Sequence, residues 1–164
     1  MSSLKVRLFF AVILALILTI LPLPELLVGL RPPWILMLVL YLQFFLPDHF
    51  NLILLLMVGL ALDVLLSTVL GEHVFALTLV AWIASNKARR FALFSIGQQM
   101  ALTGFFCLFY QLTILMIDAS LGYHAEFLMS LPSTLMSVLL WPWIRLVADD
   151  TLLAKGTYRH QGGL

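Results

Sequence analysis

Charged residues are scarce in this chain. Of its 164 residues only 10% are Asp, Glu, Lys or Arg, whereas 63% are hydrophobic, and the mean hydropathy is +1.09. A soluble domain carries about 25% charged residues, and a small domain leaves much of its surface exposed to its solvent. The composition therefore indicates a membrane protein. It excludes a soluble enzyme, a secreted disulfide-rich module and a disordered linker.

Neither an excess of one charge nor a set of cysteines is present. Nine Lys and Arg residues oppose eight Asp and Glu residues, which gives a net charge of +1. The chain thus lacks the basic surface that nucleic-acid binding needs. Its one cysteine, Cys107, excludes an intrachain disulfide, a CxxC redox pair and a zinc site built from several cysteines.

Catalytic motifs are also missing. The patterns HExxH, GxSxG and GxxxxGKS or GxxxxGKT do not occur in the sequence. Asp63 has no second acidic residue in an apolar segment with which to form a catalytic pair. The histidines stand apart from one another along the chain, at His49, His73, His124 and His160. We therefore predict that the protein is not an enzyme and holds no metal or cofactor.

What the chain does have is a series of apolar segments. They are Leu8–Leu21, Trp34–Leu46, Leu52–Leu70, His73–Asn86, Met100–Ile117 and Phe127–Val147. No segment alternates polar and apolar residues as a membrane strand does, so each is predicted to be a helix. The first has a basic flank, as a signal peptide has. Because Pro22 and Pro24 follow without a small-residue cleavage pattern, we predict a retained first span.

The positions of the basic residues predict the orientation. With the N-terminus in the cytoplasm, eight of the nine Lys and Arg residues are cytoplasmic and only Arg31 lies outside, in agreement with the positive-inside rule. The prediction is an all-α integral membrane protein with six transmembrane helices, N-in and C-in. Residues 1–148 form its single domain, and residues 149–164 form a short, frayed cytoplasmic tail.

Asp63 is the most informative polar residue. A carboxylate inside an apolar segment is costly and usually faces the bundle interior or a polar cavity. Gly59, Asp63, Ser67 and Gly71 recur every four residues, and small side chains at that spacing allow another helix to approach closely. Asp63 is either an ion, proton or ligand site or a structural carboxylate bonded across a helix interface. For the structural case we expect Arg31 to be the partner.

The last two segments carry further polar residues and an aromatic end. Hydroxyl, thiol and amide side chains at helical spacing join transmembrane helices or line a channel, and here they are Thr103, Cys107, Gln111, Ser130, Ser133, Thr134 and Ser137. Trp141 and Trp143, followed by Arg145, are predicted to form an anchor at the membrane interface. Pro142 between them is predicted to kink or unwind the helix.

Three stretches together resemble a known family. They are LRPPW at 30–34 with the apolar run that follows, GLALDVLLSTVLGEHVFALTLVAWIA at 59–84, and LWPW at 140–143. In content and order they resemble the rod-shape-determining membrane protein MreD of bacteria, over about residues 5–147. Residues 91–130 carry no motif of this resemblance and match by hydropathy only.

The resemblance implies a function without catalysis. MreD-like proteins are similar in fold to the S components of energy-coupling-factor transporters, and they are understood as scaffolds of lateral peptidoglycan synthesis in the cytoplasmic membrane. The implied direct partner is MreC, with MreB, RodA and a class B penicillin-binding protein beyond it; a homodimer stays open. The residues expected to hold the bundle or the partner interface are Arg31, Pro32, Trp34, Gly59, Asp63, Ser67, Gly71, Trp141 and Pro142.

A second hypothesis keeps the fold and changes the function. An S-component-like protein is a transporter subunit that binds a small vitamin-like molecule, and it needs a pocket of converging polar and aromatic groups. The candidates for such a pocket are Tyr41, Gln43, Tyr110 and Gln111.

Overall fold

A computed structural model describes residues 2–22, 24, 29–85, 88–91, 93–123 and 130–153. In these ranges the chain is helical and contains no strand. The longer helices are α1 (Ser2–Ile20), α2 (Trp34–Phe45), α3 (Leu52–Leu66), α4 (Glu72–Ser85), α6 (Ile96–Ser120) and α7 (Ser130–Ala148). Short helical turns complete them: η2 (Pro47–His49), α5 (Ala88–Phe91) and the π-helical η4 (Asp149–Leu153).

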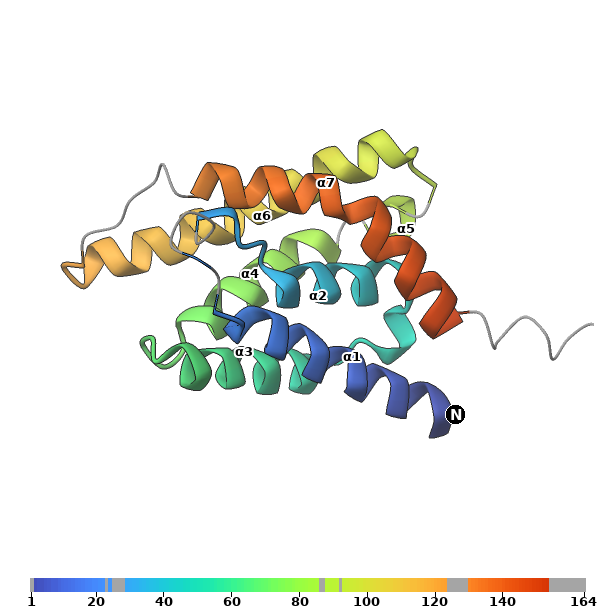
Figure 1. The fold of residues 1–164 in the computed structure, drawn as a ribbon, viewed down its shortest axis with the longest axis horizontal. Helices are drawn as coiled ribbons and strands as arrows, with labels where there is room; N and C mark the ends of the chain where they lie inside the picture. The colour runs from blue at the N-terminus through green and yellow to red at the C-terminus, as the bar shows by residue number, and fades with distance from the viewer. Residues whose placement is uncertain are drawn as a thin grey trace, which may run out of the picture.

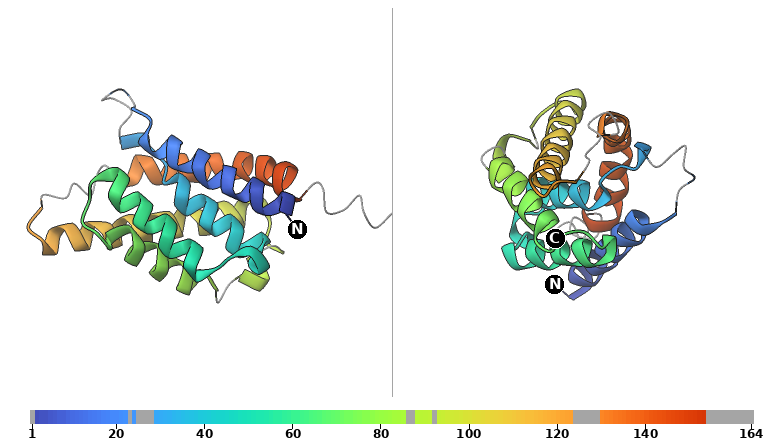
Figure 2. Two further views of the ribbon diagram at one scale, coloured as in Figure 1. Left: turned by 90° about the horizontal axis from the view of Figure 1, so that it is seen from below. Right: turned by 90° about the vertical axis from the view of Figure 1, so that its left-hand side faces the viewer.

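Helix α2 is the centre of the bundle. Its residues from Ile35 to Phe44 are all buried, as expected for a helix that is apolar on every face. It contacts α1 on one side and α4, α6 and α7 on the others, and Figures 1 and 2 show it lying among them. Pro32 and Pro33 precede Trp34, a placement that costs little because the first N–H groups of a helix have no intrahelical partner.

Helices α3 and α4 form a tight antiparallel pair. Gly59 makes the close approach, since a Cβ atom at this residue would lie 2.8 Å from the Cα of Val74. Ser67 ends α3 in the left-handed conformation, with a φ of 53°. Gly71, with a φ of 99°, then turns the chain into α4; this conformation favours glycine because it has no Cβ.

Helices α6 and α7 form the other side of the bundle (Figure 1). Helix α6 begins with a capping box, in which the Ser95 hydroxyl accepts from the Gln98 N–H and the Gln98 side chain accepts from the Ser95 N–H. Helix α7 bends along its length (Figure 1) and contains Pro142, which lacks the N–H needed for the internal helical bond. It continues into η4, so helical structure runs five residues past the predicted domain end at 148.

The six longer helices of the described residues follow the six predicted apolar segments in order, but several limits differ. Helix α1 begins at Ser2 instead of Leu8, α3 ends at Leu66 instead of Leu70, and α6 extends over Ile96–Ser120 instead of Met100–Ile117. By length and composition, α6 and the segment Ser130–Leu152 could each cross a membrane, whereas α2, α3 and α4 are shorter apolar helices. No predicted segment corresponds to α5.

Many large apolar side chains lie on the surface, and several polar side chains lie in the interior. Asp63, Glu72 and Gln99 are buried, while large apolar side chains such as Ile53, Met57 and Trp82 are exposed. In soluble proteins acidic side chains are almost never fully buried unless paired, and large apolar side chains are most often inside. A lipid environment accounts for the distribution in this protein, since apolar side chains are favourable there and polar groups need partners inside the protein.

Candidate functional site

The Asp63 carboxylate is the acceptor for a cluster of donors at one end of the bundle. Asp63 is 1% exposed. Its Oδ2 accepts from the Gly71 N–H at 2.7 Å, and its Oδ1 accepts from the His73 N–H at 2.9 Å. The Nδ1 of His73 lies 3.0 Å from Oδ1, and the Thr68 hydroxyl lies 3.5 Å from it. We call these residues the carboxylate cluster: Asp63, Thr68, Gly71 and His73.

This geometry makes Asp63 the N-terminal cap of another helix. The carbonyl of Gly71 accepts the first helical bond of α4, from the Phe75 N–H at 2.8 Å. Gly71 and His73 therefore carry N–H groups that have no acceptor within α4. A carboxylate near them satisfies these donors and also interacts favourably with the positive end of the helix dipole. Asp63 of α3 thus caps and stabilises the start of α4.

The expected partner of Asp63 is not present among these contacts. Arg31 donates through Nη2 to the Leu21 carbonyl instead, and the described residues that contact the carboxylate all belong to the α3–α4 turn or the start of α4. The prediction of an Arg31–Asp63 pair is therefore wrong. Ser67 is exposed at the end of α3, so it does not extend the packing face of Gly59 and Asp63.

The carboxylate cluster does not have the geometry of a catalytic triad. Thr68 Oγ1 lies 3.3 Å from His73 Nδ1, the same ring nitrogen that contacts Asp63. A triad needs the nucleophile and the acid on different nitrogens of the ring. Among the described residues no group of three or more His, Cys, Asp and Glu side chains could hold a metal ion; His124 and His160 lie outside these residues.

A cavity of about 440 Å³ lies beside this cluster. His73 connects the two, since it contacts Asp63 and also lines the cavity. Of the predicted pocket residues Tyr110 and Gln111 line it, whereas Tyr41 and Gln43 do not. The full lining is Thr19, Gly29, Arg31, Pro32, Pro33, Trp34, Ile35, Leu36, Leu62, Leu66, His73, Tyr110, Gln111, Ile114, Leu115, Asp118, Ser130 and Ser133.

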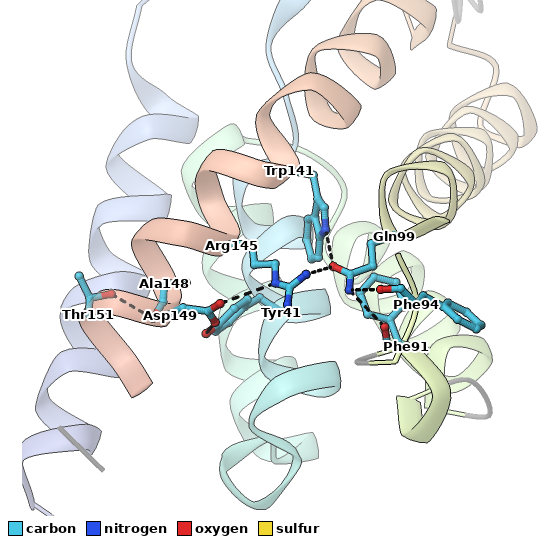
Figure 3. A network of polar contacts seen from close by, with 9 residues as sticks. All are labelled: Tyr41, Phe91, Phe94, Gln99, Trp141, Arg145, Ala148, Asp149 and Thr151. Atoms are coloured by element: carbon cyan, nitrogen blue, oxygen red, sulfur yellow. Dashed lines mark hydrogen bonds and ion pairs between the residues drawn. The ribbon is translucent and has the colours of Figure 1, made fainter. Parts of the chain in front are cut away.

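A second polar cluster lies at the other end of the bundle, around Arg145 (Figure 3). Arg145 Nη1 donates to Gln99 Oε1 at 2.9 Å, and its Nε lies 3.6 Å from Asp149 Oδ2. The Tyr41 hydroxyl donates to Asp149 Oδ1 at 2.6 Å. The guanidinium also lies over the ring of Phe45, 5.1 Å from its centroid. We call Tyr41, Gln99, Trp141, Arg145 and Asp149 the arginine network.

Gln99 joins this network to the turn before α6. Its Nε2 donates to the carbonyls of Phe94 at 3.0 Å and Phe91 at 3.3 Å, while its Oε1 accepts from Trp141 Nε1 at 3.5 Å and from Arg145 (Figure 3). The amide is fully buried and is used on both its donor and acceptor sides. It therefore couples α6, α7 and the turn after α5.

The prediction that Trp141 lies at the membrane interface is wrong. Trp141 was expected there beside Trp143, but it is 0% exposed and packs edge-on against Phe91. Trp143, 68% exposed, keeps the outward position that an interfacial residue needs. Gln99 was not among the residues predicted from the sequence. The sequence shows only that Gln99 is a glutamine next to an apolar segment. The same is true of Gln98, which is exposed.

The comparison with known families agrees with the helical and apolar character of the chain. A family model described as rod shape-determining protein MreD matches residues 2–149. No solved structure matches the chain. The match covers almost the whole described bundle, including both polar clusters. This protein therefore belongs to the MreD family of rod shape-determining membrane proteins.

Proposed function

We propose that this protein is a non-catalytic scaffold of the bacterial cell-elongation machinery in the cytoplasmic membrane. Membership of the MreD family implies a role in rod-shape determination. The proposal adds that the chain binds MreC directly and organises lateral peptidoglycan synthesis, with MreB, RodA and a class B penicillin-binding protein as indirect partners. In this proposal the protein works within the lipid bilayer and binds no nucleic acid or cofactor.

The observation that carries this proposal is the use made of the buried polar groups. The Asp63 carboxylate binds the start of α4, and the Gln99 amide binds α7 and the turn before α6. Each group joins one element of the bundle to another. Side chains used in this way stabilise a rigid body, which is what a scaffold offers to its partners.

The proposed topology has six spans, α1, α2, α3, α4, α6 and α7, with both termini in the cytoplasm and a fold like that of the transporter S components. In support, Arg7 Nη1 donates to the Thr151 carbonyl at 2.9 Å, and Arg145 Nε lies 3.6 Å from Asp149 Oδ2, two residues before Thr151. Arg7 and Arg145 therefore lie at the same end of the bundle. Arg31 lies at the other end, beside the cavity. Lys87, Lys155 and Arg159 lie outside the described residues.

The proposed contact with MreC uses the membrane helix of that partner against the outside of the bundle. Gly59, Asp63 and Gly71 keep α3 and α4 together. Arg31 and Pro32 precede α2, and Trp34 begins it. These residues act by holding the surface on which a partner helix packs. Trp141 and Pro142 have the same role in α7. A second copy of the chain is the alternative partner for this surface.

Depletion of the protein from the rod-shaped cell that encodes it tests the proposal. We expect the cells to become round and lateral wall insertion to stop, and MreC to be recovered with the tagged protein from membranes of undepleted cells. Cells that keep their rod shape after depletion, or a tagged protein that does not retain MreC, would contradict the scaffold.

The cavity supports a second candidate, a transporter subunit that binds a small molecule. Its volume of about 440 Å³ lies within the range of small-molecule sites, and aromatic and polar side chains converge on it. This candidate predicts that depletion abolishes uptake of a vitamin-like compound while the cells keep their shape. Rounded cells with normal uptake would exclude it.

A further inference from the structure

The cavity is lined by residues of α1, α2, α3, α4, α6 and α7, and besides His73, which contacts Asp63, its wall has one cationic and one anionic residue. These are the Arg31 guanidinium and the Asp118 carboxylate. Within the described part of the chain the ion pairs are His73–Asp63 and Arg145–Asp149, so neither of the two charges is paired there. Arg31 and Asp118 are half-buried, and a charge that is partly removed from water is stabilised by a partner of opposite sign. A ligand with both signs of charge would provide one for each.

Gln111, which lines the cavity, has a side-chain oxygen that is free, within the described residues, to accept a hydrogen bond. Ser133 has one hydroxyl proton, and it donates this proton to the Arg31 carbonyl. The Ser133 oxygen can therefore only accept from Gln111, whose Nε2 lies 3.0 Å away. This bond determines which end of the amide faces Ser133. Gln111 Oε1 is left buried and without a hydrogen-bond partner among the described residues.

Arg31 has a matching unused donor. Its Nη2 donates to the Leu21 carbonyl, but its Nε is buried and has no partner in the described structure. The wall thus offers an N–H beside a positive charge and, from Gln111 and Asp118, oxygens that accept. Tyr110 and Ile114 add an aromatic and an aliphatic surface. Such a wall can bind a ligand that has a small polar group next to an apolar part.

We propose that the cavity binds a zwitterionic amine, with the anionic group of the ligand at Arg31 and its ammonium group at Asp118 and Gln111 Oε1. Two sources share this chemistry, namely the head group of an aminophospholipid entering from the bilayer and a soluble amino zwitterion. The inference concerns binding at this cavity. It does not depend on whether the chain acts as a scaffold or in transport.

The test uses the purified full-length chain in detergent, freed of co-purifying lipid. The probes are phosphatidylethanolamine, phosphatidylglycerol as an anionic lipid without an ammonium group, and phosphoethanolamine as a soluble zwitterion. Native mass spectrometry measures the bound fraction, and thermal unfolding measures the shift in Tm. We expect phosphatidylethanolamine or phosphoethanolamine to bind and raise Tm, and phosphatidylglycerol to bind more weakly. Binding of phosphatidylethanolamine alone identifies a lipid ligand, and binding of both identifies the zwitterion itself.

Matched variants locate the site. Gln43 is a buried amide that also donates one bond and keeps an unpaired Oε1, but it does not line the cavity. Gln111→Met, Asp118→Asn and Arg31→Gln should each weaken binding by about tenfold or more, whereas Gln43→Met should leave the affinity unchanged. The proposal is overturned if phosphatidylglycerol binds as well as the zwitterions, if no probe binds, or if Gln43→Met and Gln111→Met bind equally.

Discussion

At the scale of single residues, the carboxylate of Asp63 shows how an ionisable group is accommodated in an apolar helix. It accepts two backbone N–H groups, from Gly71 and His73, and is nearly inaccessible to solvent. These N–H groups would otherwise have no acceptor at the start of α4. The carboxylate and the helix start therefore satisfy each other, and removing either would leave the other unpaired.

Asp63→Asn tests this mutual dependence. The amide keeps one acceptor oxygen and places an NH₂ group against N–H donors, so we expect the free energy of unfolding to fall by about 2–4 kcal/mol. Thermal or denaturant unfolding of the purified protein in detergent measures the loss. Asp150→Asn is the control, because Asp150 is exposed and should change stability by less than about 0.5 kcal/mol. Equal effects of the two substitutions would reject the role of Asp63.

A double-mutant cycle separates the two partners considered for Asp63. Because His73 contacts the carboxylate, Asp63→Ala combined with His73→Ala should lose less stability than the sum of the single losses. Because Arg31 bonds elsewhere, Asp63→Ala combined with Arg31→Ala should give additive losses. Coupling in the second pair and additivity in the first would restore the original prediction.

At the scale of elements, the separation of α3 and α4 depends on a missing side chain. The backbone of Val74 occupies the space that a Cβ of residue 59 would need. A backbone atom cannot rotate away as the end of a side chain can, so any larger residue must move the helices apart. The same pair of helices carries the Asp63 cap, whose short bonds depend on this close approach.

Gly59→Ala measures the tightness of that approach. We expect a loss of about 1–3 kcal/mol, because the added methyl group overpacks a rigid contact. Gly97→Ala is the matched control within α6, where an added Cβ meets no atom within 4 Å. There alanine should be neutral or stabilising by up to about 1 kcal/mol through its higher helix propensity. Unfolding of both variants in the same detergent gives the comparison; a harmless Gly59→Ala would contradict the close packing.

At the scale of the whole molecule, the arginine network and a neighbouring contact join the two ends of the described chain. Asp149 in η4 accepts from Tyr41 of the central helix, and the Thr151 carbonyl accepts from Arg7 of α1. Leu152 is buried. The segment after 148 thus contributes to the bundle as far as Leu152, although its sequence suggested the start of a polar tail.

Two truncations test this contribution. Removing residues 154–164 gives the reference protein, because it keeps the bonds that Asp149 and Thr151 make. Removing residues 149–164 also deletes the bonds to Tyr41 and Arg7 and the burial of Leu152, and we expect a loss of about 2–4 kcal/mol. Similar Tm values for the two truncated proteins would show that η4 does not stabilise the bundle.

Features that depend on local hydropathy were predictable from the sequence, whereas contacts between distant residues were not. Helix type and approximate position depend on local hydropathy, and the apolar segments agree with the helices in order. The partner of Asp63 depends on where α3 ends. Since α3 stops at Leu66 and not at Leu70, the turn brings Gly71 and His73 to the carboxylate, and Arg31 is not needed.

The burial of Trp141 was beyond the reach of sequence for a similar reason. Trp141 and Trp143 are two positions apart and chemically identical, and only the rotation of α7 about its axis puts the first inside and the second outside. Gln98 and Gln99 differ in the same way, since one caps α6 at the surface and the other lies within the arginine network.

The sequence alone determined that this protein is helical and lies in a membrane, because hydropathy reflects how side chains interact with lipid and water and needs no knowledge of packing. It also determined the resemblance to the MreD family, through three short stretches of the chain. The tertiary structure decided which polar atoms meet. Hydrogen bonds and ion pairs act over about 3 Å, and only the relative rotation and end points of the helices bring donors to Asp63 and Gln99 and place Arg31 and Asp118 in one cavity wall.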